Sequence, residues 1–268
     1  CVILQILYTR EPISTVGMVV NDGKREFTIQ TKRSVNASCF SFMISDEEYA
    51  ILNKLDMLEG KATLAGQADF ALGIVTGNNK KYISQEKCPN NEMVLKGTDI
   101  YKYKFRKTEN YLVFQPQLFQ QVAPAAYYRA KEKLLYRFIC DQLVFAYDDR
   151  QTLSLNSCNI VIPHIEGLSI KYIMAILNSR VAQFYFKKKF NSVKVLRSHI
   201  EQIPIPFVNK RKQNQMIAYI DQMFASSQDE RGKIYDKMDR EISKLYNLTA
   251  EEYSYVYLSV DEEKYLLS

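Results

Sequence analysis

The sequence has few of the residues from which nucleotide loops and metal centres are built. Its 268 residues include nine glycines, and none of them forms the G-x-G-x-x-G or G-x-x-x-x-G-K-[ST] loops that hold phosphates. The two histidines, His164 and His199, lie in no H-x-x-x-H pattern, and no G-x-S-x-G sequence is present. These absences exclude the common nucleotide-binding loops and give no support to a zinc hydrolase or a serine-hydrolase triad.

Disulfide and membrane signals are missing as well. The five cysteines are odd in number and show no C-x-x-C spacing, which argues against a disulfide framework and against a zinc site. No apolar run approaches the ~18 residues of a membrane span, and the opening seven residues are too short and lack the basic lead of a signal peptide. The scattered cysteines and the missing membrane signals lead us to expect a reduced, cytoplasmic protein without a membrane segment. Residue 1 is not Met, so we also expect a piece of a longer protein.

The patterns that are present predict an α+β fold in four parts. Residues 1–45 have strand patterns, with an Asn21-Asp22-Gly23 turn before an alternating run. Ser45 and the acidic residues after it predict a helix that ends near Gly60, within a linker at 46–64. A strand-rich domain is predicted at 65–207 and a helical segment at 208–268. That segment has apolar stripes at 212–226 and 229–246 and a last helix capped by Thr249.

Within 65–207 we predict several elements that would position a binding surface. A strand at 69–75 leads into a Gly/Asn turn, and 203–206 is extended because of its two prolines. Residues 134–147 and 152–163 form a strand pair, and 168–186 is one helix. Residues 100–107 alternate strictly, so we expect a strand with aromatic residues on one face and a basic ladder on the other.

The positive charge is concentrated in two stretches. Residues 80–107 contain eight basic and three acidic residues, and residues 187–212 contain eight basic residues and one acidic residue. Together they carry +12, although the whole chain carries only +6. The rest of the chain is net acidic. A polyanion such as nucleic acid is therefore expected to bind at these two stretches, unless they are simply solvated surface.

Two short acidic patterns could indicate metal chemistry, but ordinary structural roles suit them better. Glu59-Gly60-Lys61, with Asp56 upstream, has the E-x-K spacing of metal-dependent nucleases, yet it ends a predicted helix where a nuclease needs adjacent strands. Asp148-Asp149 lies at a predicted tight turn, where such pairs are common. We therefore predict no catalytic residue and no metal site in this chain.

Six phrases between Phe70 and Pro206 resemble one family when they are taken in chain order. They are Phe70-Ala71-Leu72-Gly73-Ile74-Val75 with the turn after it, Leu95-Lys96-Gly97-Thr98-Asp99-Ile100, Ala130-Lys131-Glu132-Lys133-Leu134-Leu135-Tyr136-Arg137, Leu155-Asn156-Ser157, Leu177-Asn178-Ser179-Arg180, and Ile200-Glu201-Gln202-Ile203-Pro204-Ile205-Pro206. This series resembles the target-recognition, or TaqI-like specificity, domain of Type IIG/IIS restriction-modification enzymes. The phrase Leu245–Glu252 resembles the end of such enzymes, with Asn247 where glycine is usual.

The resemblance implies a larger parent enzyme. Residues 1–45 resemble the last strands of an adenine-N6 DNA methyltransferase domain whose methyl-donor loop and catalytic motif are not in this sequence. The parent is then expected to methylate adenine with S-adenosylmethionine and to cleave DNA with Mg²⁺. This chain is expected to need no cofactor itself, to catalyse nothing, and to act with the remainder of the parent chain on double-stranded DNA.

We assign two kinds of contact residue on this interpretation. Phosphate contacts need only positive charge, and we predict Lys80, Lys81, Lys102, Lys104, Lys187, Lys188, Lys189 and Lys194. Base contacts need flat or forked groups, and we predict Asn78, Asn79, Arg106, Arg137, Asn191 and Arg197. The alternative is a non-catalytic module in which the basic stretches and tyrosines bind RNA, a single strand or an acidic protein.

Overall fold

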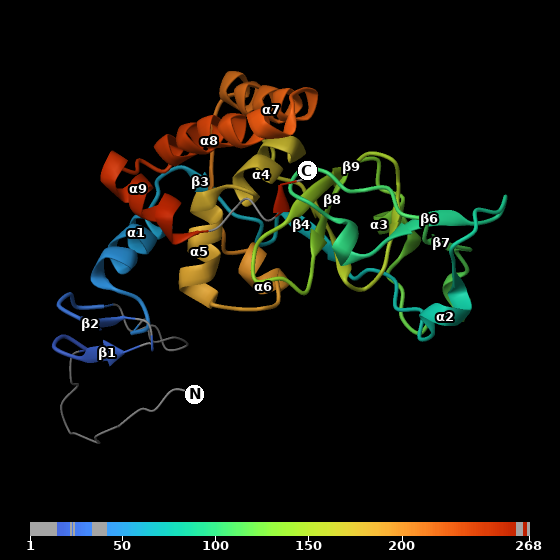
Figure 1. Cartoon of the computed structure of the whole chain (residues 1–268), viewed down its shortest axis with the longest axis horizontal. Helices are drawn as coiled ribbons and strands as arrows, with labels where there is room; N and C mark the ends of the chain where they lie inside the picture. Colours follow the sequence, from blue (N-terminus) through green and yellow to red (C-terminus); the bar gives the residue numbers. More distant parts are fainter. Residues whose placement is uncertain (1–14, 22, 24, 34–41, 261–264, 267–268) are drawn as a thin grey trace. The chain divides into compact units, whose positions relative to one another are not determined.

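The computed structural model describes residues 15–21, 23, 25–33, 42–260 and 265–266 (Figure 1). It divides into two compact units, Cys1–Lys54 (unit 1) and Leu55–Ser268 (unit 2). The part of the predicted strand patterns that falls in residues 1–14 lies outside the described residues. In the part of the chain that is described, no helix is both long and apolar enough to cross a membrane.

Unit 1 contains a hairpin and the start of a helix. Strands β1 (Val19–Asn21) and β2 (Glu26–Thr28) pair antiparallel, which confirms the predicted hairpin. Helix α1 (Asp46–Asp56) confirms the predicted helix. Its first turn is closed by Ser45, whose Oγ accepts from the Glu48 amide at 3.2 Å while the Glu48 carboxylate accepts from the Ser45 amide at 2.8 Å.

The centre of unit 2 is an antiparallel sheet with the order β4-β11-β8-β9. Its strands are β4 (Ala68–Ala71), β11 (Cys158–Pro163), β8 (Lys133–Arg137) and β9 (Phe145–Asp148). Strand β8 is apolar and buried along most of its length because it has a strand on each side and α4 packs against it. A buried ion pair at 2.5 Å between Lys133 Nζ and Asp148 Oδ2 holds its start to the end of β9.

Shorter strands and single helical turns extend unit 2 beyond this sheet. A second sheet has the order β10-β6-β7-β5, and β12 pairs with β3. The strands are β10 (Leu153–Ser154), β6 (Glu92–Leu95), β7 (Tyr111–Leu112), β5 (Ile83–Ser84), β12 (Ile205–Pro206) and β3 (Lys61–Ala62). The single turns are α2 (Asn79–Tyr82), η1 (Gly97–Asp99), η2 (Pro116–Leu118), α3 (Ala125–Tyr128) and α6 (Arg197–Ile200).

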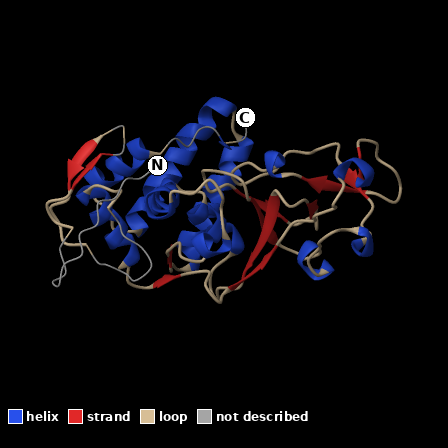
Figure 2. Cartoon of the chain, turned by 90° about the horizontal axis from the view of Figure 1, so that it is seen from below, coloured by secondary structure: helices blue, strands red, loops and turns tan. Residues whose placement is uncertain are grey.

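The longer helices gather at one end of the strands (Figure 2). They are α4 (Ile170–Leu177), α5 (Arg180–Phe190), α7 (Lys210–Ala225), α8 (Gln228–Leu245) and α9 (Ala250–Ser259). Helix α4 packs on the central sheet, α7 packs on α4, and α8 packs on α5 and α7. The predicted helices of the C-terminal segment are confirmed, including the Thr249 cap, whose Oγ1 accepts from the Glu252 amide at 3.2 Å.

Three predictions within unit 2 are wrong. Residues 134–147 are two strands of a hairpin, because the chain turns back at 138–144, and β8 pairs with both β9 and β11. Residues 168–186 are two helices, because Ser179 caps a new helix and accepts from the Ala182 amide. Residues 100–107 form only isolated bridges, and Tyr103 has a φ of 71°, which breaks the alternation that a strand would need.

Among the glycines of unit 2, Gly73 makes the closest approach to another part of the backbone. A Cβ at this position would lie 2.1 Å from the carbonyl oxygen of Leu155 and 2.5 Å from that of Cys158. The Gly73 amide also donates to Oδ1 of buried Asn159 at 3.1 Å. The segment after β4 can therefore lie against the 155–158 turn only because residue 73 has no side chain.

Gly73→Ala is expected to lower the free energy of unfolding by about 3 kcal/mol, because both contacting atoms belong to the backbone and cannot rotate away. Urea denaturation followed by circular dichroism measures the change. Gly232→Ala is the matched control: Gly232 lies within α8 with nothing near its missing Cβ. Helix propensity should make that variant about 1 kcal/mol more stable. Equal effects of the two substitutions would contradict the close approach.

Candidate nucleic-acid interface

The first candidate surface is the basic segment 187–199, which contains five lysines or arginines and no acidic residue. It begins in the last turn of α5, where three lysines interact favourably with the negative end of the helix. Asn191 then ends the helix in the left-handed conformation, with a φ of 44°, as asparagine often does. Its side chain is exposed.

The loop from Asn191 to Leu196 is fixed by hydrogen bonds along its length. The Ser192 hydroxyl accepts from the Lys194 amide at 3.1 Å and donates to the Lys194 carbonyl at 2.8 Å. The Val195 amide donates to the Phe138 carbonyl at 2.8 Å, and the Cys140 amide donates to the Val193 carbonyl at 3.1 Å. The loop is therefore paired with the β8–β9 turn through its backbone.

His199 closes the far side of this loop. Its ring stacks on Phe190 with the centroids 4.4 Å apart, and its Nδ1 accepts from the Leu196 amide at 3.3 Å. Partial burial lowers the pKa of His199. A lowered pKa favours the neutral imidazole, which is the form whose Nδ1 can accept this hydrogen bond. His199 therefore has a structural role.

The predicted contact residues of this segment differ in their availability. Lys194 and Arg197 are exposed, although Arg197 also pairs with Glu201 at 2.8 Å and lies over the Phe70 ring at 5.1 Å. Lys187 and Lys188 are half-buried at the end of α5. Lys189 donates to both carboxylate oxygens of Asp56 at 3.0 Å, so its charge is already neutralised within unit 2.

A second group of predicted residues lies around α2. Asn78 caps this turn and accepts from the Lys81 amide at 3.2 Å, and Asn79 accepts from the Thr76 hydroxyl at 2.6 Å. Each amide oxygen therefore has an internal partner, whereas both residues are exposed. Lys80 and Lys81 are exposed beside them. This turn presents two amides and two cations together.

Lys102 is not a surface residue, and its predicted phosphate contact is contradicted. Its exposed fraction is 0%, and its Nζ donates to the Asn178 carbonyl at 2.9 Å. Burial lowers the pKa of Lys102 well below its ordinary value, although Asp239 acts in the opposite direction. The basic ladder does not exist because residues 100–107 do not form a regular strand.

Arg137 is also unsuited to reading a base. Its Nε donates to the Ile100 carbonyl at 2.7 Å, and its guanidinium lies over the rings of Tyr101 and Tyr265 at 5.4 and 4.6 Å. The fork that would have contacted a base instead holds the 98–101 segment in place. We correct its assignment to a structural one.

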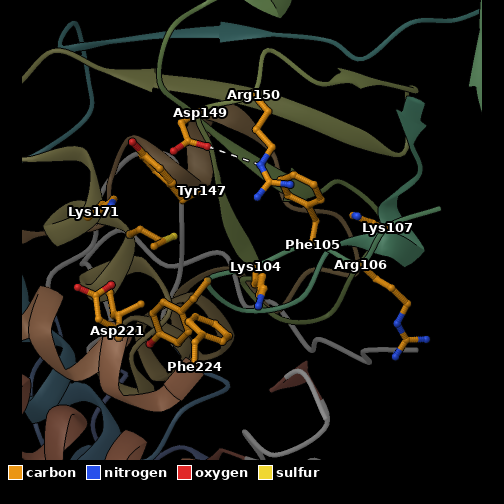
Figure 3. Close-up of a pocket in the computed structure, with 13 residues that line it drawn as sticks. Lys104, Phe105, Arg106, Lys107, Tyr147, Asp149, Arg150, Lys171, Asp221 and Phe224 are labelled. Atoms are coloured by element: carbon orange, nitrogen blue, oxygen red, sulfur yellow. Dashed lines mark ion pairs between the residues drawn. The ribbon is translucent and has the colours of Figure 1, made fainter. Parts of the chain in front are cut away.

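The remaining cations of this region line a hollow of about 580 Å³ (Figure 3). Its wall combines basic and aromatic side chains, and Lys104 Nζ lies 4.7 Å from the centroid of the Phe224 ring. Its acidic lining residues are Asp149 and Asp221, and Asp149 Oδ1 lies 4.0 Å from Arg150 Nε. Figure 3 shows Arg106 pointing away from the other lining residues. The basic residues are Lys104, Arg106, Lys107, Arg150 and Lys171, and the aromatic ones are Tyr103, Phe105, Tyr147 and Phe224.

Two cations of the hollow were not predicted from the sequence. Arg150 follows an acidic pair that we interpreted only as a turn, and Lys171 lies in the first turn of α4. Lys171 Nζ lies 4.7 Å from the centroid of the Tyr147 ring. No spacing rule links these two residues to Lys104, because the sheet and α4 bring them together from three segments.

The structure places residues 104–107 and the segment 191–197 against different elements. The residues of 104–107 line the hollow, which α4 and α7 help to form. The segment 191–197 pairs with the β8–β9 turn and leads into α6.

The weak metal candidates gain no support in the described part of the chain. No cluster of three or more His, Cys, Asp or Glu residues that could hold a metal ion occurs among the described residues. Asp56 accepts from the Tyr185 hydroxyl at 2.5 Å and pairs with Lys189. His164 Nε2 lies 2.7 Å from Asp69 Oδ2 in an exposed pair. Asp148 caps the turn after β9 by accepting from the Arg150 and Thr152 amides.

Residues 92–205 match the family model of the TaqI-like C-terminal specificity domain, which confirms the resemblance noted in the sequence for this segment. No curated protein gives a significant match. The similar solved structures include a chain from a type I R-M system, with 14% identity, a TM-score of 0.42, and 79% of this chain and 51% of that chain covered.

Two further solved structures have comparable scores. The HsdS subunit from Thermoanaerobacter tengcongensis has 14% identity and a TM-score of 0.40, with 75% of this chain and 51% of that chain covered. The Type IIL restriction-modification enzyme MmeI, in complex with DNA, has 9% identity and a TM-score of 0.46, with 71% and 35% covered. This chain therefore spans about half the length of the first two structures and about a third of MmeI.

The burial of Lys102 leads to a testable difference from an exposed lysine of the 187–199 segment. Lys194→Met should make the dependence of log affinity for duplex DNA on log salt shallower by about one, because an exposed cation is lost. Lys102→Met should leave this slope unchanged, because its ammonium is enclosed by protein. Fluorescence anisotropy titrations at several salt concentrations measure both slopes. A shallower slope for Lys102→Met would show that its ammonium reaches DNA.

Proposed function

We propose that this chain recognises a specific sequence in double-stranded DNA, because residues 92–205 match the family model of the TaqI-like C-terminal specificity domain. The match to the family model is the observation that carries the proposal. The exposed cations of 187–199 and of α2 support it, since a surface for duplex DNA needs positive charge that water can reach. The chain's net charge of +6 agrees with a polyanionic partner.

The segment 187–199 has the two properties that a base-reading loop needs. It is fixed at both ends, by α5 and by α6, and it pairs with the β8–β9 turn in between. It also presents a forked guanidinium on Arg197 and an amide on Asn191, which are suited to guanine and adenine. Lys187, Lys188 and Lys194 would contact the phosphates on either side.

The turn at α2 would supply a second contact of the same kind. The amide oxygens of Asn78 and Asn79 accept hydrogen bonds, whereas their NH₂ groups donate none within the described residues and are available as donors. Lys80 and Lys81 would neutralise neighbouring phosphates. On this proposal one duplex contacts α2 together with the segment 187–199.

The parent protein is the finer part of the proposal. We infer a Type IIG/IIS enzyme that methylates adenine N6 and cleaves DNA in the cytoplasm, with S-adenosylmethionine and Mg²⁺ bound by parts outside this chain. The support is the sequence resemblance of residues 1–45 to the end of a methyltransferase domain, together with the specificity domain that follows. The remainder of the parent would then be this chain's partner.

One observation favours a second candidate function, which is single-strand or RNA binding. The hollow combines five cations with four aromatic side chains, and stacking of unpaired bases on such rings is how many single-strand proteins bind. If the hollow is the main binding site, RNA or a single strand should bind more tightly than a duplex.

Competition between the nucleic acids separates these candidates. The chain should bind duplex DNA more tightly than a single strand or an RNA of the same sequence. If about six phosphates are neutralised, log affinity should fall with log salt at a slope near −5. Anisotropy titrations from low to moderate salt measure this slope. Affinity that does not change with salt, or a preference for RNA, would contradict the proposal.

Arg197 tests the base-reading loop directly. Arg197→Ala should cost roughly 1–3 kcal/mol on the preferred site and relax preference at one base pair. Lys194→Ala, three residues earlier in the same loop, is the matched control and should weaken all sequences about equally. Sequencing of duplexes selected from a random library by each variant measures preference. The roles are wrong if only Lys194→Ala changes the selected sequence.

A further inference from the structure

The loop at 191–196 carries a group of exposed apolar side chains beside its cations. Ile139 on the β8–β9 turn is 67% exposed, Val193 is 69% exposed and Leu196 is 38% exposed. Single apolar residues on a surface are common, but these three lie on two loops that are paired through their backbones. We refer to Ile139, Val193 and Leu196 together as the apolar tip.

The two loops that carry the apolar tip are joined through their backbones. Ile139 pairs antiparallel with Lys194, so the side chains of these two residues lie on the same face of the ribbon. The Cys140 and Val195 amides complete the pairing through hydrogen bonds to Val193 and Phe138. An exposed isoleucine is therefore held next to an exposed lysine.

The apolar tip is also supported from below by α5. The side chain of Gln183 is fully buried, and it donates to the Leu143 carbonyl at 2.7 Å and accepts from the Leu143 amide at 2.8 Å. The same helix leads directly into the 191–196 loop through Asn191. Helix α5 is thus hydrogen-bonded to one loop and continuous with the other. Loops that are anchored in this way lose little conformational entropy when they bind.

From this geometry we propose that the apolar tip, with Ile139 at its centre, inserts between base pairs of bound DNA and unstacks one step. This inference rests on the proposed function. Proteins that kink a duplex place an aliphatic wedge beside cations that hold the flanking phosphates. Here Lys194 and Arg197 flank the wedge, whereas Asp141 is the one exposed carboxylate on the turn itself. The surrounding charge favours DNA over an apolar protein partner, which would gain little from these cations.

Fluorescence of 2-aminopurine, which rises when the base is unstacked, tests the wedge. The probe is a duplex selected from a random library by the unaltered chain, with 2-aminopurine placed at each adenine in turn. The unaltered chain should raise the fluorescence at one position. Ile139→Ser should lose this rise and bind about tenfold more weakly, whereas Ile139→Leu should retain it. The salt slope should be the same for all three proteins, because no charge changes.

The matched control is Leu258→Ser, which removes a side chain that is 81% exposed on α9 and leaves the apolar tip intact. It should keep both the fluorescence rise and the affinity. Failure of the unaltered chain to bind duplex DNA would overturn the proposed function and the wedge together. Binding without a fluorescence rise at any position, or a rise that persists in Ile139→Ser, would overturn the wedge alone. Thermal unfolding of each variant shows that the fold is kept.

Discussion

The buried residue Asn178, between α4 and α5, joins the central sheet, the segment 100–107 and helix α8. Its side chain accepts from the Phe145 amide at 3.0 Å and donates to the Phe145 carbonyl at 2.9 Å, as a neighbouring strand would. Its own carbonyl accepts from Lys102 and from the Tyr235 hydroxyl, each at 2.9 Å. An unpaired buried amide is costly. At Asn178 the helix ends, and the polar groups of this residue are paired with β9, the segment 100–107 and α8.

The sequence predicted those helices and strands whose caps and apolar spacing lie within the same segment, and it failed where contacts with distant segments decide the structure. Helices α7, α8 and α9 were predicted because caps and apolar stripes lie within each segment. The break at Asn178-Ser179 was not predicted, because the apolar spacing continues across it and its reason is a contact with Phe145 in another strand. The ladder at 100–107 failed for a similar reason: alternation assumes a regular strand, and only neighbours far along the chain decide whether one forms.

The same dependence on distant contacts limited the prediction of the candidate interface. The sequence located the two basic stretches, and most of the predicted lysines and arginines are indeed exposed. It could not show that Lys102 is buried, because the groups around it, Asn178 and Tyr235, are many residues away. Nor could it show that residues 138–140 lie against 193–195, since no periodicity marks a pair of loops. Charge is readable from composition, but accessibility depends on tertiary contacts.

The buried contacts of α8 have a consequence for engineering. Asp239 accepts from the Arg180 amide at 2.7 Å and from the Tyr253 hydroxyl at 2.9 Å, and Tyr235 contacts Asn178. A chimera that joins the strands of one such protein to the helices of another at residue 207 would place Arg180 and Asp239 on different ancestral sequences. An unmatched charge would then be buried at the junction. The transferable unit for exchanging specificity is therefore the strands together with α8 and α9.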